Sequence, residues 1–142
     1  MLPFRRSPYN INEEDYDGFT PLHYGVKSGK DMVELLISLG ANVNAKTKKE
    51  ETALMFATKL QNKDVVETLI THGADVNATA SRGETALMLA TELKNKDLVE
   101  TLISHGADVN AKSKQGISAL SIASYHGYKE IEELLISHQG NT

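Results

Sequence analysis

Three histidines recur at a fixed interval and are the first candidates for chemistry in this chain. They are His72, His105 and His138, and the two intervals between them are equal. Imidazole nitrogens bind transition metals, so a row of metal ions is one hypothesis. Each histidine, however, stands one residue before a glycine or its replacement at the end of an expected helix, where the helix dipole favours a cation. No cysteine or carboxylate completes a matching ligand set. We therefore expect no metal and no cofactor.

The remaining reactive side chains form no catalytic pattern. No Ser-His-Asp order, glycine-rich phosphate loop or metal-ligand spacing stands out in the sequence. Cysteine is absent, which excludes disulfides and thiolate sites and fits the cytosol. The sequence therefore predicts no catalytic residue and no enzymatic activity of its own.

An internal repeat dominates the sequence. "GADVNA" at 73–78 returns at 106–111, and the related "GANVNA" stands one period earlier at 40–45. The histidines follow the same period. A fixed period in this range indicates stacked supersecondary units rather than one globular core. Such a chain presents a long continuous surface and usually lacks a catalytic cleft.

Each unit carries the signals of two short helices. The expected N-caps of the first helix are Thr20, Thr52, Thr85 and Ser118. Asn62 and Asn95 are expected to cap the second helix, and Gly73 and Gly106 to end it. The second helix has an apolar stripe, which in one copy is Val65, Val66, Leu69 and Ile70. One unit cannot bury both faces of its helix pair, so we expect an all-α solenoid in which the leucines are buried between repeats.

The segment "DGFTPLHYGVKSGKDMVELLISLGANVNA" at 17–45 resembles an ankyrin repeat in its Thr-Pro-Leu-His opening and its period. The resemblance implies an ankyrin-repeat solenoid of helix-turn-helix units with finger loops. It divides the chain into a degenerate N-terminal cap or partial repeat at 1–16 and a repeat domain at 17–142, with copies at about 17–48, 49–81, 82–114 and 115–142. Only the first copy keeps Pro21 and His23, whose ring we expect to hydrogen-bond within its own turn. Glu50 stands where other copies have glycine, and we expect it to strain its turn.

Both ends of the array depart from the internal copies. Asn10-Ile11-Asn12 precedes Gly18 at the same spacing as Asn42-Val43-Asn44 precedes Glu50. This segment resembles the tail of an earlier repeat, either worn down or cut from a longer array. In the last copy, Glu132 occupies the place of Val33, Val66 and Val99. We expect Glu132 to form the solvated outer face of a C-terminal cap, because burying an unpaired carboxylate is costly.

Asparagines close each copy and allow two interpretations. Asn44, Asn77 and Asn110 can hydrogen-bond their own backbone and hold the turn. The family resemblance adds a second possibility, modification by cytosolic asparaginyl hydroxylase, helped by a leucine upstream in each copy. These leucines are Leu36, Leu69 and Leu102.

The resemblance also implies where a partner would bind. Family members contact partners through the loop tips and the exposed side of the first helix, on one concave face. The positions here are Tyr16, Phe19, Lys59, Leu60, Arg82, Glu84, Glu92, Leu93, Ile117 and Tyr125. Contiguous apolar side chains rimmed by charge are typical of a protein interface. Leu60 and Leu93 have an alternative role, extending the first helix and packing locally, because Gln61 and Lys94 replace the usual glycine.

Composition limits the class of partner. The net charge of −4 argues against general nucleic-acid binding, and no apolar segment is long enough for a membrane helix. We expect a monomeric, cytoplasmic or nuclear, non-catalytic interaction module that binds a protein or peptide. The alternative is the interaction portion of a larger protein whose enzymatic or regulatory domain lies elsewhere.

Overall fold

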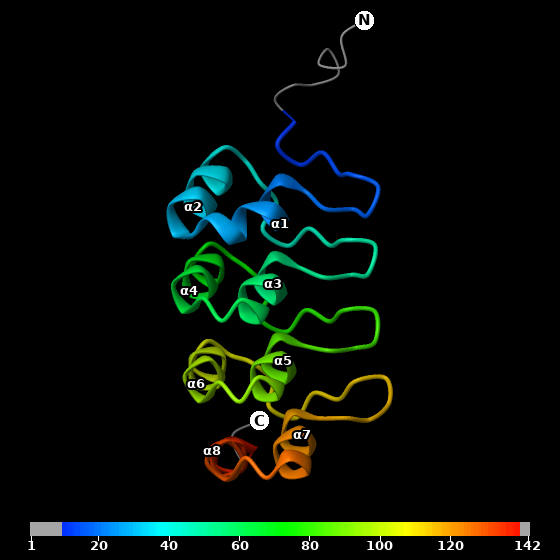
Figure 1. Ribbon diagram of the computed structural model, residues 1–142, viewed down its shortest axis with the longest axis vertical. Helices are drawn as coiled ribbons and strands as arrows, with labels where there is room; N and C mark the ends of the chain where they lie inside the picture. The colour runs from blue at the N-terminus through cyan, green and yellow to red at the C-terminus, as the bar shows by residue number, and fades with distance from the viewer. Residues whose placement is uncertain (1–9, 140–142) are drawn as a thin grey trace, which may run out of the picture.

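The computed structural model describes residues 10–139. Within this range the chain forms eight α-helices and one 3₁₀ turn, arranged as a stack of helix pairs (Figure 1). The elements are α1 (Pro21–Gly25), η2 (Val26–Ser28), α2 (Lys30–Ser38), α3 (Ala53–Lys59), α4 (Lys63–Thr71), α5 (Ala86–Glu92), α6 (Lys96–Ser104), α7 (Ala119–His126) and α8 (Lys129–Gln139). The predicted all-α repeat solenoid is confirmed.

The helix pairs lie in two columns, and finger loops project from one side of the stack. The first helices of the pairs, α1, α3, α5 and α7, form the column next to the fingers, and the second helices form the other (Figure 1). The fingers comprise residues 13–19, 45–51, 78–84 and 111–117. Each finger is closed by the same backbone bond at its base, such as the one from Ala80 N–H to the Glu84 carbonyl (2.9 Å). The fingers and first helices together form one face of the molecule, called here the finger face.

The predicted caps are present at the helix ends. The Thr52 and Thr85 hydroxyls accept hydrogen bonds from the amides of Met55 and Met88, each at 3.3 Å. Asn62 likewise accepts from Val65 N–H at the start of α4 (3.2 Å). These bonds satisfy amides that have no partner inside the helix, so each short helix begins at a defined residue.

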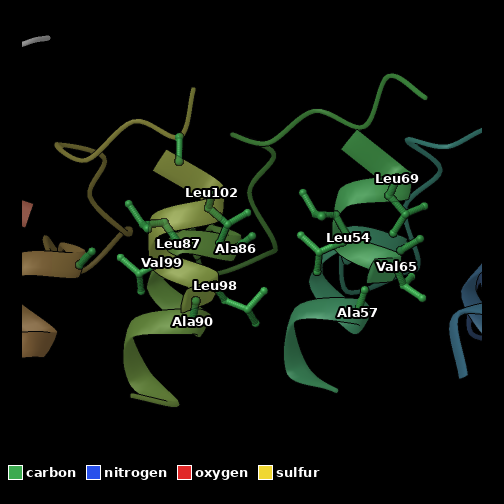
Figure 2. Close-up of a cluster of buried hydrophobic side chains, with 14 of the residues drawn as sticks. Leu54, Ala57, Val65, Leu69, Ala86, Leu87, Ala90, Leu98, Val99 and Leu102 are labelled. Carbon is green, nitrogen blue, oxygen red and sulfur yellow. The ribbon is translucent and has the colours of Figure 1, made fainter. Parts of the chain in front are cut away.

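The core runs along the stack between adjacent helix pairs. Figure 2 shows Leu54, Leu69, Leu87 and Leu102 pointing into this layer, together with the small side chains of Ala57 and Ala90. All six are buried. The alanines let the helices approach closely, and the leucines of the second helices are fully enclosed, as the sequence predicts.

Repeat 1 is one residue shorter between its two helices, a difference that the sequence analysis did not predict. The caps of the first helices, Thr20 and Thr52, are 32 positions apart, whereas Val33 and Val66 in the second helices are 33 positions apart. Repeat 1 therefore lacks one residue between its first and second helix. Gly29, at φ +97°, takes the place of the two residues Gln61 and Asn62. As a result the first helix tightens into the 3₁₀ turn η2 instead of continuing as α-helix.

The last repeat ends the stack differently from the internal ones. Val66 and Val99 are fully buried, whereas Glu132 at the same position is half-buried. Its carboxylate accepts a hydrogen bond from the Ser124 hydroxyl (2.7 Å). In the preceding repeat the matching hydroxyl, Thr91, bonds instead to the Leu87 carbonyl (2.8 Å). The carboxylate at the end of the stack is therefore paired within its own repeat, and only part of its surface is in contact with solvent.

Candidate interaction groove

Neighbouring fingers are joined by one backbone hydrogen bond each, and this row of bonds positions the finger face. Lys48 N–H donates to Asp17 (2.9 Å), Ser81 N–H to Lys49 (3.1 Å) and Lys114 N–H to Arg82 (3.0 Å). The bond from Ser81 N–H to the Lys49 carbonyl lies next to Glu50, whose φ of +61° is in the left-handed region. The strained turn expected at Glu50 is therefore present as a positive φ. The finger tips are fixed relative to one another along the whole stack.

A groove opens on the finger face between the third and fourth repeats. It has a volume of about 590 Å³ and lies between two fingers and helices α5 and α7. Its lining residues are Arg82, Glu84, Met88, Leu89, Glu92, Ser113, Gln115, Ile117, Ser121, Ile122, Tyr125 and His126. We call this feature the α5–α7 groove.

The groove brings together half of the partner-binding residues proposed from the sequence. These are Arg82, Glu84, Glu92, Ile117 and Tyr125. Tyr125 is 86% exposed and Ile117 is 43% exposed, so both offer apolar surface. Met88, Leu89, Ser121 and Ile122 also line the groove and were not among the predicted residues. Met88 and Ser121 occupy equivalent positions of successive repeats, as do Leu89 and Ile122. Because equivalent positions lie side by side in a stack, this spacing is the signal that could have found them.

The aromatic side chains at the C-terminal end of α7 pack in series. The Tyr125 ring meets the His126 ring edge-on, with centroids 5.1 Å apart. His126 stacks on Tyr128 at 5.0 Å, and its Nε2 lies 3.7 Å from the Glu92 carboxylate. This pair is ionic only when the imidazole is protonated. These contacts hold Tyr125 at the groove edge while leaving most of its ring exposed.

Phe19 does not lie free on the finger face, and the expectation that it is exposed is wrong. It is half-buried because its ring stacks on Phe56 and packs against Tyr24, with centroids 5.2 Å apart in both cases. Lys59 Nζ lies over the same Phe56 ring at 5.3 Å and bonds the Glu51 carboxylate at 2.7 Å. Between repeats 1 and 2, aromatic rings therefore occupy the region that is open between repeats 3 and 4.

Leu60 and Leu93 lie at the C-terminal ends of α3 and α5 and do not line the groove. Each continues its helix as the C-cap, and Gln61 and Lys94 follow with the positive φ of +58°. Leu60 is 49% exposed and Leu93 39% exposed. Both leucines therefore extend the first helix of their repeat, as the alternative interpretation predicts. Both side chains nevertheless keep substantial exposed surface. A role in binding stays a prediction for both.

Tyr16 marks the tip of the first finger and is 92% exposed. The turn beside it is held by Asp15, whose carboxylate accepts hydrogen bonds from Asp17 N–H and Phe19 N–H, each at 2.9 Å. The Tyr24 hydroxyl also donates to Asp15. This bond lowers the pKa of the Asp15 carboxyl and raises that of the Tyr24 phenol. The first finger is thus ordered against α1 while its tip remains open.

His23 links helix α1 to the next finger. Thr20 N–H donates to its Nδ1 (2.8 Å), as expected for a bond within its own turn. Its Nε2–H donates to the Ala45 carbonyl in the next finger (3.0 Å), a contact that sequence reasoning missed. Burial lowers the pKa of this imidazole below its usual 6.5, because the charged form loses hydration. The neutral ring, with one donor and one acceptor, matches both partners.

Asn44 and Asn77 bridge neighbouring repeats instead of bonding their own backbone, which corrects the sequence interpretation for these two closing asparagines. Asn44 Nδ2–H donates to the Gly73 carbonyl (3.1 Å), and its Oδ1 accepts from Asp75 N–H (2.7 Å). Asn77 makes the same pair with Gly106 and Asp108, at the same distances. Asn12 does so with Gly40 and Asn42. The tail at residues 10–12 thus contacts repeat 1 as the tails of repeats 1 and 2 contact the repeats that follow them. Hydroxylation of Asn44, Asn77 or Asn110 stays a prediction.

The periodic histidines act at the helix ends. Nδ1–H of His72 donates to the Thr68 carbonyl (2.9 Å), that of His105 to Thr101 (2.8 Å) and that of His138 to Leu134 (3.0 Å). Each ring satisfies a carbonyl in the last turn of its helix. Among the described residues, no group of three His, Cys, Asp or Glu side chains is arranged to hold a metal ion.

Comparison with known proteins identifies the family. The family model described as "Ankyrin repeats (3 copies)" matches residues 2–80, 40–113 and 78–142, which together cover almost the whole chain. The chain belongs to the ankyrin repeat family. Across residues 10–139, no helix has the length and apolar character that crossing a membrane requires.

Similar curated proteins share only short stretches with this chain. Ankyrin repeat protein OPG189 of monkeypox virus is 52% identical over 40 residues, which is 28% of this chain and 7% of that protein. A transient receptor potential cation channel subfamily A member 1 homolog of Caenorhabditis elegans is 40% identical over 55 residues, 38% of this chain and 4% of the channel. Alpha-latrotoxin-Lh1a of Latrodectus hasselti is 59% identical over 29 residues, which is 20% of this chain and 2% of that protein. The chain thus matches less than a tenth of each relative's length.

Proposed function

We propose that this chain is a non-catalytic interaction module that binds a protein or peptide partner on its finger face, at the α5–α7 groove. Ankyrin repeats are generally protein–protein interaction modules, and the family is typically non-catalytic. The observation that carries the proposal is the groove itself. It combines exposed apolar side chains with charged residues at its margins, the composition of an interface centre and rim.

The polar groups in the groove favour binding over catalysis. Ser121 and His126 both line it and could suggest a nucleophile and its base. The Ser121 hydroxyl, however, accepts from Ser118 N–H and donates to the Ser118 carbonyl, each at 2.9 Å. This hydroxyl therefore belongs to the cap of α7.

The remaining proposed contacts extend the same face toward the N-terminus. Tyr16, Phe19, Lys59, Leu60 and Leu93 stay proposals for a partner larger than the groove.

We also propose that the chain acts as a monomer in the cytoplasm, which sedimentation and cell fractionation would test. A second candidate is the interaction portion of a larger protein, which the much greater length of the similar proteins favours. The full open reading frame would decide between the two.

A photo-crosslinking experiment tests the groove. A photoreactive amino acid at Gln115, a groove residue, should capture the partner from source lysate for identification by mass spectrometry. Tyr125→Ala and Ile117→Ala should then weaken that partner by about 1–3 kcal/mol each in calorimetry, the cost of truncating an interface anchor. Helical circular dichroism should be unchanged.

The matched controls are Lys63→Ala and Lys96→Ala at the starts of α4 and α6. These side chains form exposed ion pairs with Asp97 and Glu130. Such pairs contribute little to stability, and we expect little change in binding. Loss of the partner in the two lysine variants, with Tyr125→Ala and Ile117→Ala unaffected, would place the binding surface on the other face.

A further inference from the structure

Two glutamates of repeat 3 occupy the positions of an ion pair in repeat 2. Glu51 and Lys59 are bonded at 2.7 Å on the finger face of repeat 2. The equivalent residues of the next repeat are Glu84 and Glu92, so the lysine is replaced by a second carboxylate. Both glutamates line the α5–α7 groove.

The backbone around the two sites is equivalent, so the comparison of positions is direct. Helix α3 runs from Ala53 to Lys59 and α5 from Ala86 to Glu92, and each is capped by a threonine at the same distance of 3.3 Å. The residues at 84 and 92 therefore project from the same places as those at 51 and 59. Repeat 3 directs two carboxylates toward the site that an ammonium group occupies in repeat 2.

Within the described part of the chain, these carboxylates have little compensation. Glu92 lies 3.7 Å from His126, a pair that is ionic only on protonation of the imidazole. No side-chain cation lies within ion-pair distance of Glu84 among the described residues. Like charges held near one another repel, and this repulsion is relieved when a cation binds between them.

Apolar side chains share the groove with the two carboxylates. Leu89, Ile122 and Tyr125 line the same groove. Arg82 stands at its finger end and would repel a second basic group. The groove therefore complements one cation next to apolar side chains, and it disfavours a run of basic residues.

We infer that the α5–α7 groove binds a peptide segment of the partner that carries a single arginine or lysine beside an apolar residue. The basic group lies between Glu84 and Glu92, at the place that Lys59 Nζ has in repeat 2, and the apolar side chain packs against Ile122 and Tyr125. This inference rests on the proposed function and specifies the chemistry of its ligand.

Selection from a random peptide library displayed on phage tests the inference with the intact chain. At mildly alkaline pH the enriched peptides should carry one basic residue next to an apolar one. Synthetic peptides of that sequence should lose about tenfold in affinity or more on Glu92→Lys, which places a lysine where repeat 2 has Lys59. Tyr125→Ala should weaken them as well.

Glu100→Lys is the matched control. Glu100 is an exposed glutamate on α6, outside the groove, and its substitution makes the same change in net charge. We expect its effect on affinity to stay within about twofold, since exposed charges far from the ligand are screened by salt. Thermal melts of both variants should match the original chain.

Three other results would overturn the inference, and they differ in whether binding at the groove still stands. Peptides that require Tyr125 but show no enrichment of basic residues would overturn this inference and leave the proposed groove standing. Peptides weakened equally by Glu92→Lys and Glu100→Lys would reduce the effect to general charge, which also overturns it. If no selected peptide depends on Tyr125, both the inference and binding at the groove are wrong.

Discussion

The first two repeats and the last two are built from the same stacked helix pairs but present different surfaces at their finger faces. Between repeats 1 and 2, the Phe19 ring stacks on Phe56 and packs against Tyr24, and Lys59 Nζ lies over the Phe56 ring. Between repeats 3 and 4, the corresponding positions hold smaller side chains, and a groove of about 590 Å³ remains open. Leu89 of repeat 3 stands where repeat 1 has Tyr24, and Ile122 of repeat 4 stands where repeat 2 has Phe56.

The contrast shows that the stack and its binding surface are specified by different residues. The buried leucines and the capping threonines and asparagines recur in both halves and set the geometry. The residue types in the finger-face column decide whether two neighbouring repeats close against each other or leave room for a ligand. A repeat array can therefore place a groove between one pair of repeats without altering its core.

The largest expected effect tests whether the two halves share one core. Leu69→Ala and Leu102→Ala should each lower the free energy of unfolding by roughly 2–5 kcal/mol, because both leucines are fully buried. Chemical denaturation measures the loss. Similar costs at the two sites support a common core. A loss below about 0.5 kcal/mol at either site, which is typical of the surface, would contradict the burial seen here.

The next prediction concerns the finger turns, which hold Glu50 in one half and Gly83 in the other. Gly83 has φ +83°, and a Cβ atom there would lie 2.8 Å from the Lys114 amide nitrogen. Gly83→Ala should cost about 2 kcal/mol, from positive φ and this clash. Glu50→Gly should instead stabilise the chain by about 0.5–1 kcal/mol, since it relieves the φ of +61°. Thermal denaturation of both variants checks the opposite signs.

Exchanging the residue types in the finger-face column tests the origin of the groove. Phe56→Leu removes a stacked ring from repeat 2 and should cost about 1 kcal/mol. The reciprocal Leu89→Phe places a ring in the α5–α7 groove and should weaken the captured partner about tenfold, an effect typical of blocking an interface centre. Calorimetry measures both. Unchanged binding by Leu89→Phe would mean that the partner does not enter the groove.

A smaller effect should be confined to repeat 1, where His23 is held neutral. Its folded-state pKa lies below the usual 6.5, so the unfolded chain binds the proton more readily. The contribution of His23 to stability is therefore complete above that value and is lost as the pH falls through the lower, folded-state pKa. Denaturation at several pH values should show this decline, reduced in His23→Gln. Identical pH profiles for the two proteins would contradict it.

The smallest expected change in stability is at the end of the array. Glu132→Val restores the valine of the internal repeats and removes the bond from Ser124. Stability should change by less than about 0.5 kcal/mol, as at an ordinary surface position, while the enlarged apolar face promotes self-association. Analytical ultracentrifugation would detect the association. A clear loss of stability in a chain that stays monomeric would mean that the Ser124–Glu132 pair is important to the fold.

Much of the fold could be predicted because its signals repeat. Thr52, Thr85, Asn62 and Asn95 were identified as caps from their positions ahead of apolar stripes, and each accepts the expected backbone bond. The deletion before α2 was harder to see, because it shifts only one helix connection. Its signal was present in the shortened interval between the capping threonines Thr20 and Thr52.

The candidate site was predictable in position but not in shape. The family resemblance placed Arg82, Glu92 and Tyr125 on one face, and all three line the groove. Whether a side chain on that face is free depends on its neighbour in the next repeat, which a single copy does not reveal. Phe19 was expected to be exposed, yet it stacks on Phe56. The sequence pattern shows which residues lie on the finger face, but it does not show which side chains are large enough to meet across two repeats.

The asparagine bridges make certain loop amides reporters of the whole stack. The N–H groups of Asp75 and Asp108 belong to exposed residues, and exposure alone would let them exchange rapidly with solvent deuterium. Each is held at 2.7 Å by an asparagine of the preceding repeat. Exchange at these sites therefore requires adjacent repeats to separate. Their protection would measure, one junction at a time, how often the array opens.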